Sequence, residues 1–366
     1  MKMNILWITA DYFIDCDFNL VPYIRSLGVN VIWKVVKTST HIEISSDLEC
    51  SVISLKYKSL DPRVIFDYKK IFCDVDLDKI DVVYSDFVGV PFYYPYVFHK
   101  LKRKRRIPLV HAAHNIIPYK GWPNRFLMEK YLTYVFHKNQ YFQIFSKHLI
   151  PYFEKHYPGK TIFNCPLAVK SYGEVTTNSY NVDPSKLNLL FFGNVKENKH
   201  LDLLIEVMNT LPETLNGRVH LTIAGKCDDT EMYEAMIGTN ENIVAYFRRI
   251  NDCEVSELFV KHDFLVLPYS DVAQSGPLMI AYSYGMPVIC SDIDGFREHV
   301  TDGKTGFLFE VNNVKSLANV ISRAYTNKKE SYGMIKQNLE EYVDKTYSIH
   351  SVSTRYLEFF NSIIGG

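Results

Sequence analysis

Short runs of apolar residues recur in the first part of the chain, and each is followed by polar loop residues. β-Branched and aromatic residues dominate the runs at 4–9, 31–36 and 81–84, and a further apolar run lies at 109–113. Runs of this length and composition are typical of strands buried on both faces of a parallel sheet. Helical stretches separate them, so the alternation predicts a doubly wound α/β domain over residues 1–170.

The same pattern restarts after a polar segment. Residues 171–186 are rich in Asn, Ser and Thr and contain a proline, which is typical of a linker. Beyond it the pattern predicts strands at 189–192, 219–224, 264–267 and 288–290, with helices at 201–211 and 275–284. We therefore expect a second Rossmann-like domain over residues 187–345.

The end of the chain has helical periodicity. Within 346–366 the spacing of apolar residues predicts a helix at 348–364, with one apolar face. That face consists of residues spaced three or four apart: Val352, Tyr356, Phe359, Phe360 and Ile363.

Composition and charge exclude several classes of protein. The formal net charge is zero, so no basic field favours a nucleic-acid partner. The seven cysteines are scattered without a Cys-x-x-Cys pair, which argues against a disulfide framework or a zinc site. No apolar run reaches the ~20 residues of a membrane span, and the apolar run at 5–9 is too short for a signal peptide. We expect a cytoplasmic protein.

Two lysines follow the first strand of the second domain. The strand runs into Gly193, and Lys196 and Lys199 stand where the next helix begins. Lysines at the mouth of such a strand can reach a diphosphate bound at the strand ends. The alternative is that both are solvated surface residues. Positive charge opposes the dipole at a helix start, which makes the position unfavourable without an anionic ligand.

A second group of residues predicts an anion site. Gln274, Ser275, Gly276 and Pro277 combine an N-cap residue, a glycine and a first-turn proline at a helix start. The N–H groups at such a start can hold a phosphate. An ordinary capped helix would have the same spacing, so this segment alone leaves both interpretations open.

The order of these motifs resembles glycosyltransferase family 4, of GT-B fold. The resemblance rests on Phe-Phe-Gly with two following lysines at 191–199, Ala-Gly at 224–225, Leu-Pro-Tyr at 267–269, Gln-Ser-Gly at 274–276, and the segments 281–289, 295–298 and 302–307. In the first domain, 114–118 resembles the His-Asn-x-x-Pro segment of one branch. The resemblance implies two Rossmann-like domains facing a cleft, with the helix of 346–366 crossing back to the first domain.

The resemblance also implies roles for individual residues. Lys199 matches the diphosphate-binding lysine. The family arginine falls at Asn194, so Lys196 is expected to replace it. Backbone groups of Gly193 and of 274–277 would hold the donor, and Arg249 and Ile250 fall where the family's backbone contacts the nucleobase. His114 would reach the donor sugar, and Glu298 lies in a turn that is either structural or donor-binding. Asp11 and Tyr12 are expected at the acceptor.

The resemblance implies transfer of a sugar from a nucleotide-sugar, UDP- or GDP-linked, with retention of anomeric configuration. The acceptor would be a glycan or a polyprenyl-diphosphate-linked sugar, as in capsule or O-antigen synthesis. Two family glutamates are replaced by Val272 and Ile280. No cofactor or metal is expected, and the Asp-x-Asp triplets at 74–78 and 292–294 are interpreted as solvated acids. An inverting enzyme would need a base, for which Asp11 and Asp86 are candidates.

An aromatic stretch joins a basic run at 93–106, and Trp122, Arg125, Phe126 and Lys130 follow. Such a combination suits peripheral contact with an anionic membrane, here the inner face of the cell membrane. A solvated helix end with complementary cations is the alternative. Two other functions stay open: a GT-B-fold nucleotide-sugar epimerase and a non-catalytic partner subunit.

Overall fold

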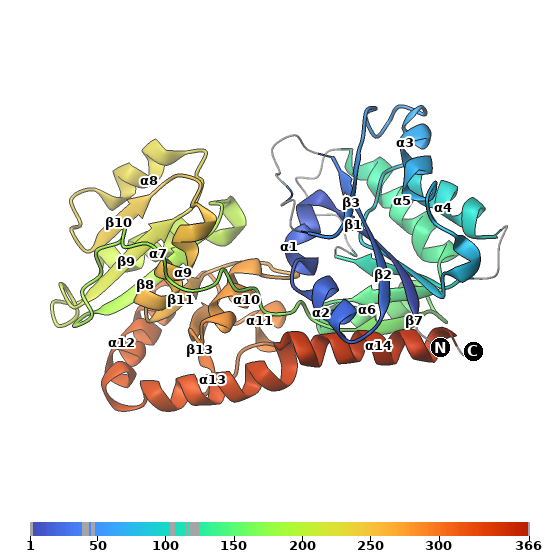
Figure 1. Ribbon diagram of the computed structural model, residues 1–366. Helices are drawn as coiled ribbons and strands as arrows, with labels where there is room; N and C mark the ends of the chain where they lie inside the picture. The colour runs from blue at the N-terminus through green and yellow to red at the C-terminus, as the bar shows by residue number, and fades with distance from the viewer. Residues whose placement is uncertain are drawn as a thin grey trace. The chain divides into compact units, whose positions relative to one another are not determined.

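The computed structural model describes residues 3–38, 44, 48–102, 107–114, 116 and 124–364 (Figure 1). The chain forms two compact units. Unit 1 consists of Met1–Ala168 together with Ile349–Gly366, and unit 2 consists of Val169–Ser348. Each unit has its own parallel sheet covered by helices, so the prediction of two Rossmann-like α/β domains is confirmed.

The sheet of unit 1 has seven parallel strands in the order β3-β2-β1-β4-β5-β6-β7. The strands are β1 (Asn4–Ala10), β2 (Asn30–Lys37), β3 (Ser51–Ser54), β4 (Val82–Ser85), β5 (Leu109–Ala113), β6 (Tyr141–Ile144) and β7 (Thr161–Asn164). The helices are α1 (Ile14–Asp17), α2 (Leu20–Ser26), α3 (Val64–Ile71), α4 (Tyr93–Lys102), α5 (Arg125–Lys138), α6 (Ile150–His156) and α14 (Ile349–Ile364), with short 3-10 turns at Asp11–Phe13, Leu77–Lys79 and Lys147–Leu149.

Alternate residues of β1 enter two different cores, because successive side chains of a strand point to opposite faces. Leu6 and Ile8 pack with residues of α3, α4 and α5. Ile5 and Trp7 pack with residues of α2 and α14 on the other face (Figure 1). Both faces of the sheet are therefore buried, which explains why its strands are apolar throughout.

Helix α14 is part of the core of unit 1. Val352, Tyr356, Phe360 and Ile363 are buried there, as the predicted apolar face requires. The Tyr356 hydroxyl donates to Gln143 Oε1 at 2.8 Å, and the Tyr84 hydroxyl donates to the same oxygen at 2.7 Å. The expected return of the C-terminal helix to the first domain is thus observed within unit 1.

The sheet of unit 2 has six parallel strands in the order β10-β9-β8-β11-β12-β13. The strands are β8 (Leu187–Phe192), β9 (Val219–Ala224), β10 (Ile243–Tyr246), β11 (Phe264–Leu267), β12 (Val288–Ser291) and β13 (Gly306–Phe309). The helices are α7 (Leu201–Asn209), α8 (Thr230–Ile237), α9 (Asp252–Lys261), α10 (Gly276–Ser283), α11 (Asp294–Arg297), α12 (Val314–Glu330) and α13 (Tyr332–Tyr347), with a 3-10 turn at Glu197–Lys199. This strand order is the doubly wound one.

The segment 171–186 contains no helix or strand, in keeping with its composition. It nevertheless lies on unit 2, where the Ser256 hydroxyl donates to the Glu174 carbonyl at 3.1 Å. Strands β3 and β6 were absent from the expectations, because the residues of β3 are mostly exposed and the polar Gln143 interrupts the short apolar run of β6. None of the helices that the structure describes has the length and apolar content needed to cross a bilayer.

Candidate functional site

The loops that follow the strands of unit 2 lie along one edge of the sheet, because all six strands are parallel. Ligands of open α/β sheets bind at this edge, where the strand order reverses. In unit 2 the reversal falls between β8 and β11, which are neighbours in the sheet. The predicted residues 193–199 and 274–277 follow these two strands, so the topology brings both groups to the switch point.

Gly193 and Gly225 bring two of these loops into backbone contact. The Gly193 N–H donates to the Ala224 carbonyl at 2.9 Å. A Cβ atom on Gly225 would lie 2.1 Å from the Gly193 carbonyl oxygen, so only glycine fits there. Gly193 itself has φ of +109°, a conformation that favours glycine. The loops after β8 and β9 therefore touch with no side chain between them.

Lys199 lies directly beside Gly193. Its Nζ would be 3.3 Å from a Cβ placed on Gly193, and it lies 5.4 Å from the centre of the Tyr269 ring. Burial lowers the pKa of Lys199 to about 8, and the positive charge of Lys196 adds to this effect. Among the described residues, no carboxylate forms an ion pair with Lys199. A half-buried cation without a counter-ion suits an anionic ligand.

The start of α10 reaches the same place. The Pro277 ring would lie 3.5 Å from a Cβ on Gly193, and Ser275 caps the helix by accepting the Leu278 N–H at 3.3 Å. A Cβ placed on Gly276 would meet no atom within 4 Å, so the first turn of the helix is open there. Gly193, Lys199 and the positive end of the α10 dipole thus converge.

Neighbouring loops brace this arrangement. The Ser270 N–H donates to the Asn198 carbonyl at 3.0 Å, which ties the loop after β11 to the lysine turn. A Cβ on Gly295 would lie 2.2 Å from the Val272 carbonyl oxygen, so the turn that contains Glu298 packs against the same loop. The Glu298 carbonyl accepts from Tyr342 at 3.1 Å. Gln274 lies half-buried in the loop after β11, and Asn194 lies exposed in the loop after β8.

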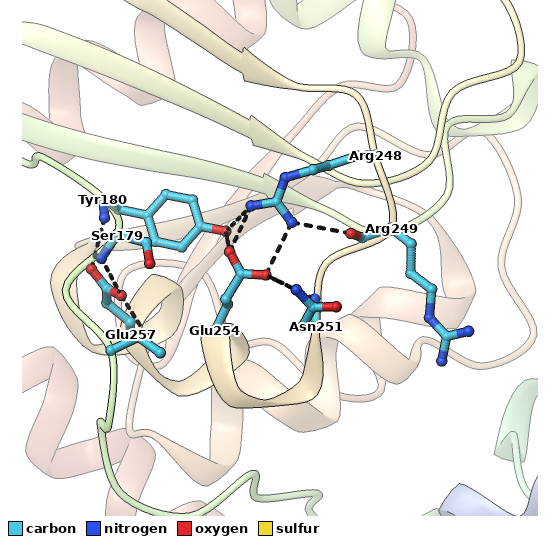
Figure 2. Close-up of polar contacts among 8 residues, drawn as sticks. Ser179, Tyr180, Arg248, Arg249, Asn251, Glu254 and Glu257 are labelled. Carbon is cyan, nitrogen blue, oxygen red and sulfur yellow. Dashed lines mark hydrogen bonds and ion pairs between the residues drawn. The ribbon is translucent and has the colours of Figure 1, made fainter. Parts of the chain in front are cut away.

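The loop after β10 holds Arg249 and Ile250. The Arg249 side chain is exposed and points away from the neighbouring Arg248–Glu254 ion pair (Figure 2). The Ile250 side chain is buried. The Glu254 carboxylate accepts hydrogen bonds from Nη2 and Nη1 of Arg248, at 2.6 and 3.0 Å. Chiefly because of these hydrogen bonds, the pKa of Glu254 is lowered to about 2.

Unit 1 contains a pocket of about 820 Å³ at the carboxyl edge of its sheet. Tyr12 and His114 line it, together with the segment 55–59 and residues of α5. The His114 ring is stacked between Phe13 and Phe145, with ring centres 3.6 and 4.4 Å away. Tyr12 is 49% exposed at the pocket wall. The pocket is mainly apolar and aromatic, with Lys56 and Lys58 as its cations.

Asp11, expected at the acceptor, is buried beside the pocket rather than in its lining. Its carboxylate is buried and accepts the Thr38 N–H at 2.9 Å and the Thr38 hydroxyl at 2.7 Å. Those hydrogen bonds hold the loop after β2, and Asp11 does not line the pocket. Asp86 is also buried and accepts the Ala10 N–H at 2.7 Å. Burial, and then the charge of Asp17, hold the pKa of Asp86 well above its usual range.

The aromatic part of 93–106 is mostly turned into unit 1. Tyr93 and Tyr94 are completely buried in the core of unit 1, so they are unavailable to a membrane. The basic residues 103–106, and Trp122, lie outside the described residues. Phe126 is 69% exposed on α5, and Lys130 Nζ lies 4.2 Å above its ring.

Several acids of the Asp-x-Asp triplets form ion pairs while staying exposed to solvent. Arg297 contacts Asp292 at 2.6 Å and Asp294 at 3.0 Å. Asp74 pairs with the buried Lys34 at 2.6 Å. Over the described part of the chain, no group of three or more His, Cys, Asp or Glu residues is placed to hold a metal ion.

Sequence reasoning gave no individual role to several residues of these sites. Tyr269 was noted only as part of a motif, yet its ring lies under Lys199. Phe13 and Phe145 hold His114 from positions 132 residues apart (145 − 13), which only the fold brings together. Tyr180 and Glu254 are likewise distant in the sequence, and the fold brings them within hydrogen-bond distance.

The sequence of unit 2 is similar to those of known glycosyltransferases. The family model "Glycosyl transferases group 1" matches residues 175–341. The lipopolysaccharide glucosyltransferase WaaG of Escherichia coli K12 is 27% identical over 182 residues, which cover 49% of this chain and 47% of WaaG. The chain thus matches about half the length of its curated relatives.

Solved structures match over nearly the whole chain. A glycosyltransferase from Rickettsia africae has a TM-score of 0.76 at 16% identity, covering 99% of both chains. HepE from Anabaena, solved in complex with UDP-glucose, has a TM-score of 0.72 at 14% identity, covering 99% of this chain and 100% of HepE. The chain therefore has the fold of GT-B glycosyltransferases, and residues 175–341 are similar to the glycosyl transferases group 1 family.

Proposed function

We propose that this protein is a glycosyltransferase that moves a sugar from a UDP- or GDP-sugar to a glycan or polyprenyl-diphosphate-linked acceptor. The convergence of Lys199, Gly193 and the start of α10 carries the proposal. A cation, bare backbone and a helix N-terminus at one switch point form a site for a diphosphate. The group 1 match of unit 2 supports the same function.

The proposed reaction is transfer with retention and without a metal. As the sugar leaves, negative charge grows on the diphosphate, where Lys196, Lys199 and the amides of 274–276 would stabilise it. The leaving phosphate would accept the proton of the acceptor hydroxyl on the same face. The burial of Asp11 and Asp86 supports this route, because a carboxyl held protonated or hydrogen-bonded is a poor general base.

The acceptor is proposed to bind the unit 1 pocket, with Tyr12 and His114 in its wall. The WaaG relative and the apolar, lysine-containing lining favour a lipid-linked acceptor in surface-polysaccharide synthesis. Peripheral contact with the inner membrane would then use α5, where Phe126 and Lys130 project as an aromatic–cation pair.

A thermal-shift screen against UDP, GDP and their sugars, followed by a transfer assay with and without EDTA, tests the proposal. Stabilisation by one nucleotide and EDTA-resistant transfer by the wild type but not by Lys199→Ala would support it. Binding without donor hydrolysis or transfer would favour a non-catalytic partner subunit. Interconversion of the nucleotide-sugar without acceptor would favour an epimerase.

A further inference from the structure

An ion pair joins Arg248, in the loop of residues 247–251 after β10, to Glu254 of α9. Both side chains of this pair also form hydrogen bonds with the backbone of the loop. Arg248 Nη1 donates to the Arg249 carbonyl at 3.1 Å as well as to Glu254. Glu254 accepts the Asn251 N–H at 3.0 Å and the Asn251 side chain at 2.7 Å (Figure 2). The loop is therefore fixed from both sides of Ile250, at the carbonyl before it and at the N–H after it.

These two contacts set the direction of the free groups of Ile250. In a trans peptide the C=O and the N–H point in opposite directions. The Arg249 carbonyl points to the Arg248–Glu254 pair, so the Ile250 N–H points away from it. The Asn251 N–H points to the same pair, so the Ile250 C=O also points away. Within the described chain, neither group of Ile250 has a hydrogen-bond partner.

A donor and an acceptor on one residue, turned outward together, match the edge of a nucleobase. Uracil presents a ring N–H next to a carbonyl, and this pair complements the C=O and N–H of one residue. The position fits as well. β10 lies two strands from β8 in the sheet, a spacing of about 10 Å, so a nucleotide whose diphosphate lies at Lys199 would place its base near this loop.

A third residue joins the ion pair to the segment that enters unit 2. The Tyr180 hydroxyl donates to Glu254 Oε1 at 3.0 Å and lies 3.4 Å from Arg248 Nη2. One turn along α9, Glu257 accepts the N–H groups of Ser179 and Tyr180, both at 2.8 Å (Figure 2). Glu254 and Glu257 are both buried, but only Glu254 contacts the 248–251 loop.

We infer that Arg248, Glu254 and Tyr180 are positioning residues that hold the Ile250 N–H and C=O in place to read the nucleobase of the donor. The inference rests on the proposed function: the backbone contact with the base is what the family resemblance implies, and the three side chains that position it are the addition. The side chains of the three residues act through the loop and do not touch the ligand. They govern the affinity for the nucleoside part of the donor, while Lys199 and α10 govern the affinity for its diphosphate.

The test compares two ligands on matched variants. Calorimetry would measure the Kd of UDP and of inorganic pyrophosphate for the wild type, Glu254→Gln, Tyr180→Phe and the control Glu257→Gln. Loss of a hydrogen bond to a charged group predicts that Glu254→Gln binds UDP about 10–100-fold more weakly. Pyrophosphate affinity should stay within about twofold, and Tyr180→Phe should show a smaller change in the same direction. Glu257→Gln should retain wild-type affinity for both ligands.

Kinetics provide a second readout, because a misplaced loop should raise the KM for the donor and leave kcat near its wild-type value. Equal weakening of UDP and pyrophosphate binding, or an unchanged UDP affinity in Glu254→Gln, would overturn the inference. If Glu254→Gln does not fold, Tyr180→Phe and Arg248→Lys carry the same test. If wild-type protein binds neither UDP nor GDP, the proposed function itself fails, which is a distinct result.

Discussion

Gly225 faces the backbone of Gly193 at a distance that excludes even a methyl group. A Cβ on Gly225 would approach the carbonyl carbon of Gly193 to 2.6 Å. We predict that Gly225→Ala forces the two loops apart, lowers the free energy of unfolding by about 1–3 kcal/mol and weakens nucleotide binding. Chemical unfolding and UDP titration would measure both.

The matched control for this substitution is Gly333→Ala. Gly333 lies in α13, and a Cβ there would meet no atom within 4 Å. Alanine is the better helix former, so this variant should be about 0.5–1 kcal/mol more stable and bind UDP normally. A Gly225→Ala protein as stable as the wild type, with intact UDP binding, would contradict the described approach of the two loops.

Removal of Lys199 should abolish most of the activity. Because no described carboxylate pairs with its ammonium group, Lys199→Ala should leave the fold intact while turnover falls by about two orders of magnitude or more. Lys226→Ala is the control, since Lys226 is exposed and pairs with Asp228 at 3.1 Å. Near-normal transfer by the Lys199 variant would remove the basis of the proposed diphosphate site.

The lowered pKa of Lys199 predicts a pH dependence of nucleotide binding. Its pKa of about 8 means that the ammonium charge is present at pH 7 and is lost as the pH rises through 8. UDP affinity should therefore decline above pH 8 in the wild type. Lys199→Arg keeps its charge at this pH and should give a flatter profile between pH 7 and 9. Parallel profiles for the two proteins would exclude Lys199 as the titrating group.

Stability should also depend on pH through His262. The Leu258 carbonyl accepts from His262 Nδ1 at 2.7 Å and the Thr222 hydroxyl lies 2.7 Å from Nε2, which together suit the neutral ring. Burial lowers the pKa of His262 to about 4. The unfolded chain binds a proton near pH 6.5, so this contribution is present above that pH and is lost as the pH falls towards 4.

We expect His262 to account for about 2 kcal/mol of the fall in stability between pH 7 and pH 5. Urea unfolding at the two pH values would show this fall, and His262→Gln should reduce it. An identical dependence in the His262 variant would show that other groups are responsible.

The proposed membrane contact of α5 predicts a specific binding defect. Phe126→Ser and Lys130→Glu should each reduce sedimentation with anionic liposomes, and neither should affect neutral liposomes. Phe66→Ser is a close control, since Phe66 on α3 is 59% exposed and has Lys69 Nζ 4.9 Å above its ring. Equal losses in both phenylalanine variants would argue against a surface confined to α5.

Much of the fold could be predicted because buried parallel strands are apolar on both faces. β1, β5, β9 and β11 are examples, and they were placed within one residue. The four-residue strands β3 and β10 lacked such a pattern. β3 lies at the edge of its sheet with mostly exposed residues, so neither propensity nor periodicity marks it.

The candidate site was predictable where backbone conformation demands a residue type. Gly193 and the Ser275–Pro277 cap are visible in sequence because turns and helix starts select glycine, serine and proline. The burial of Asp11 and Tyr93 could not be predicted from the sequence. Burial decides whether a polar or aromatic side chain can contact a ligand or a membrane, and it depends on segments distant in the sequence. Asp11 follows β1, but Thr38 after β2 takes up its carboxylate.

The division of the chain has a consequence for how the protein folds during synthesis. Unit 2 is one continuous segment, whereas α14, which belongs to the core of unit 1, is made only after the whole of unit 2. Domains tend to fold as units while the chain emerges from the ribosome. Unit 2 can thus complete its core first, while the apolar surface of unit 1 around Trp7 stays uncovered. A growing chain would therefore expose that surface until α14 has been made.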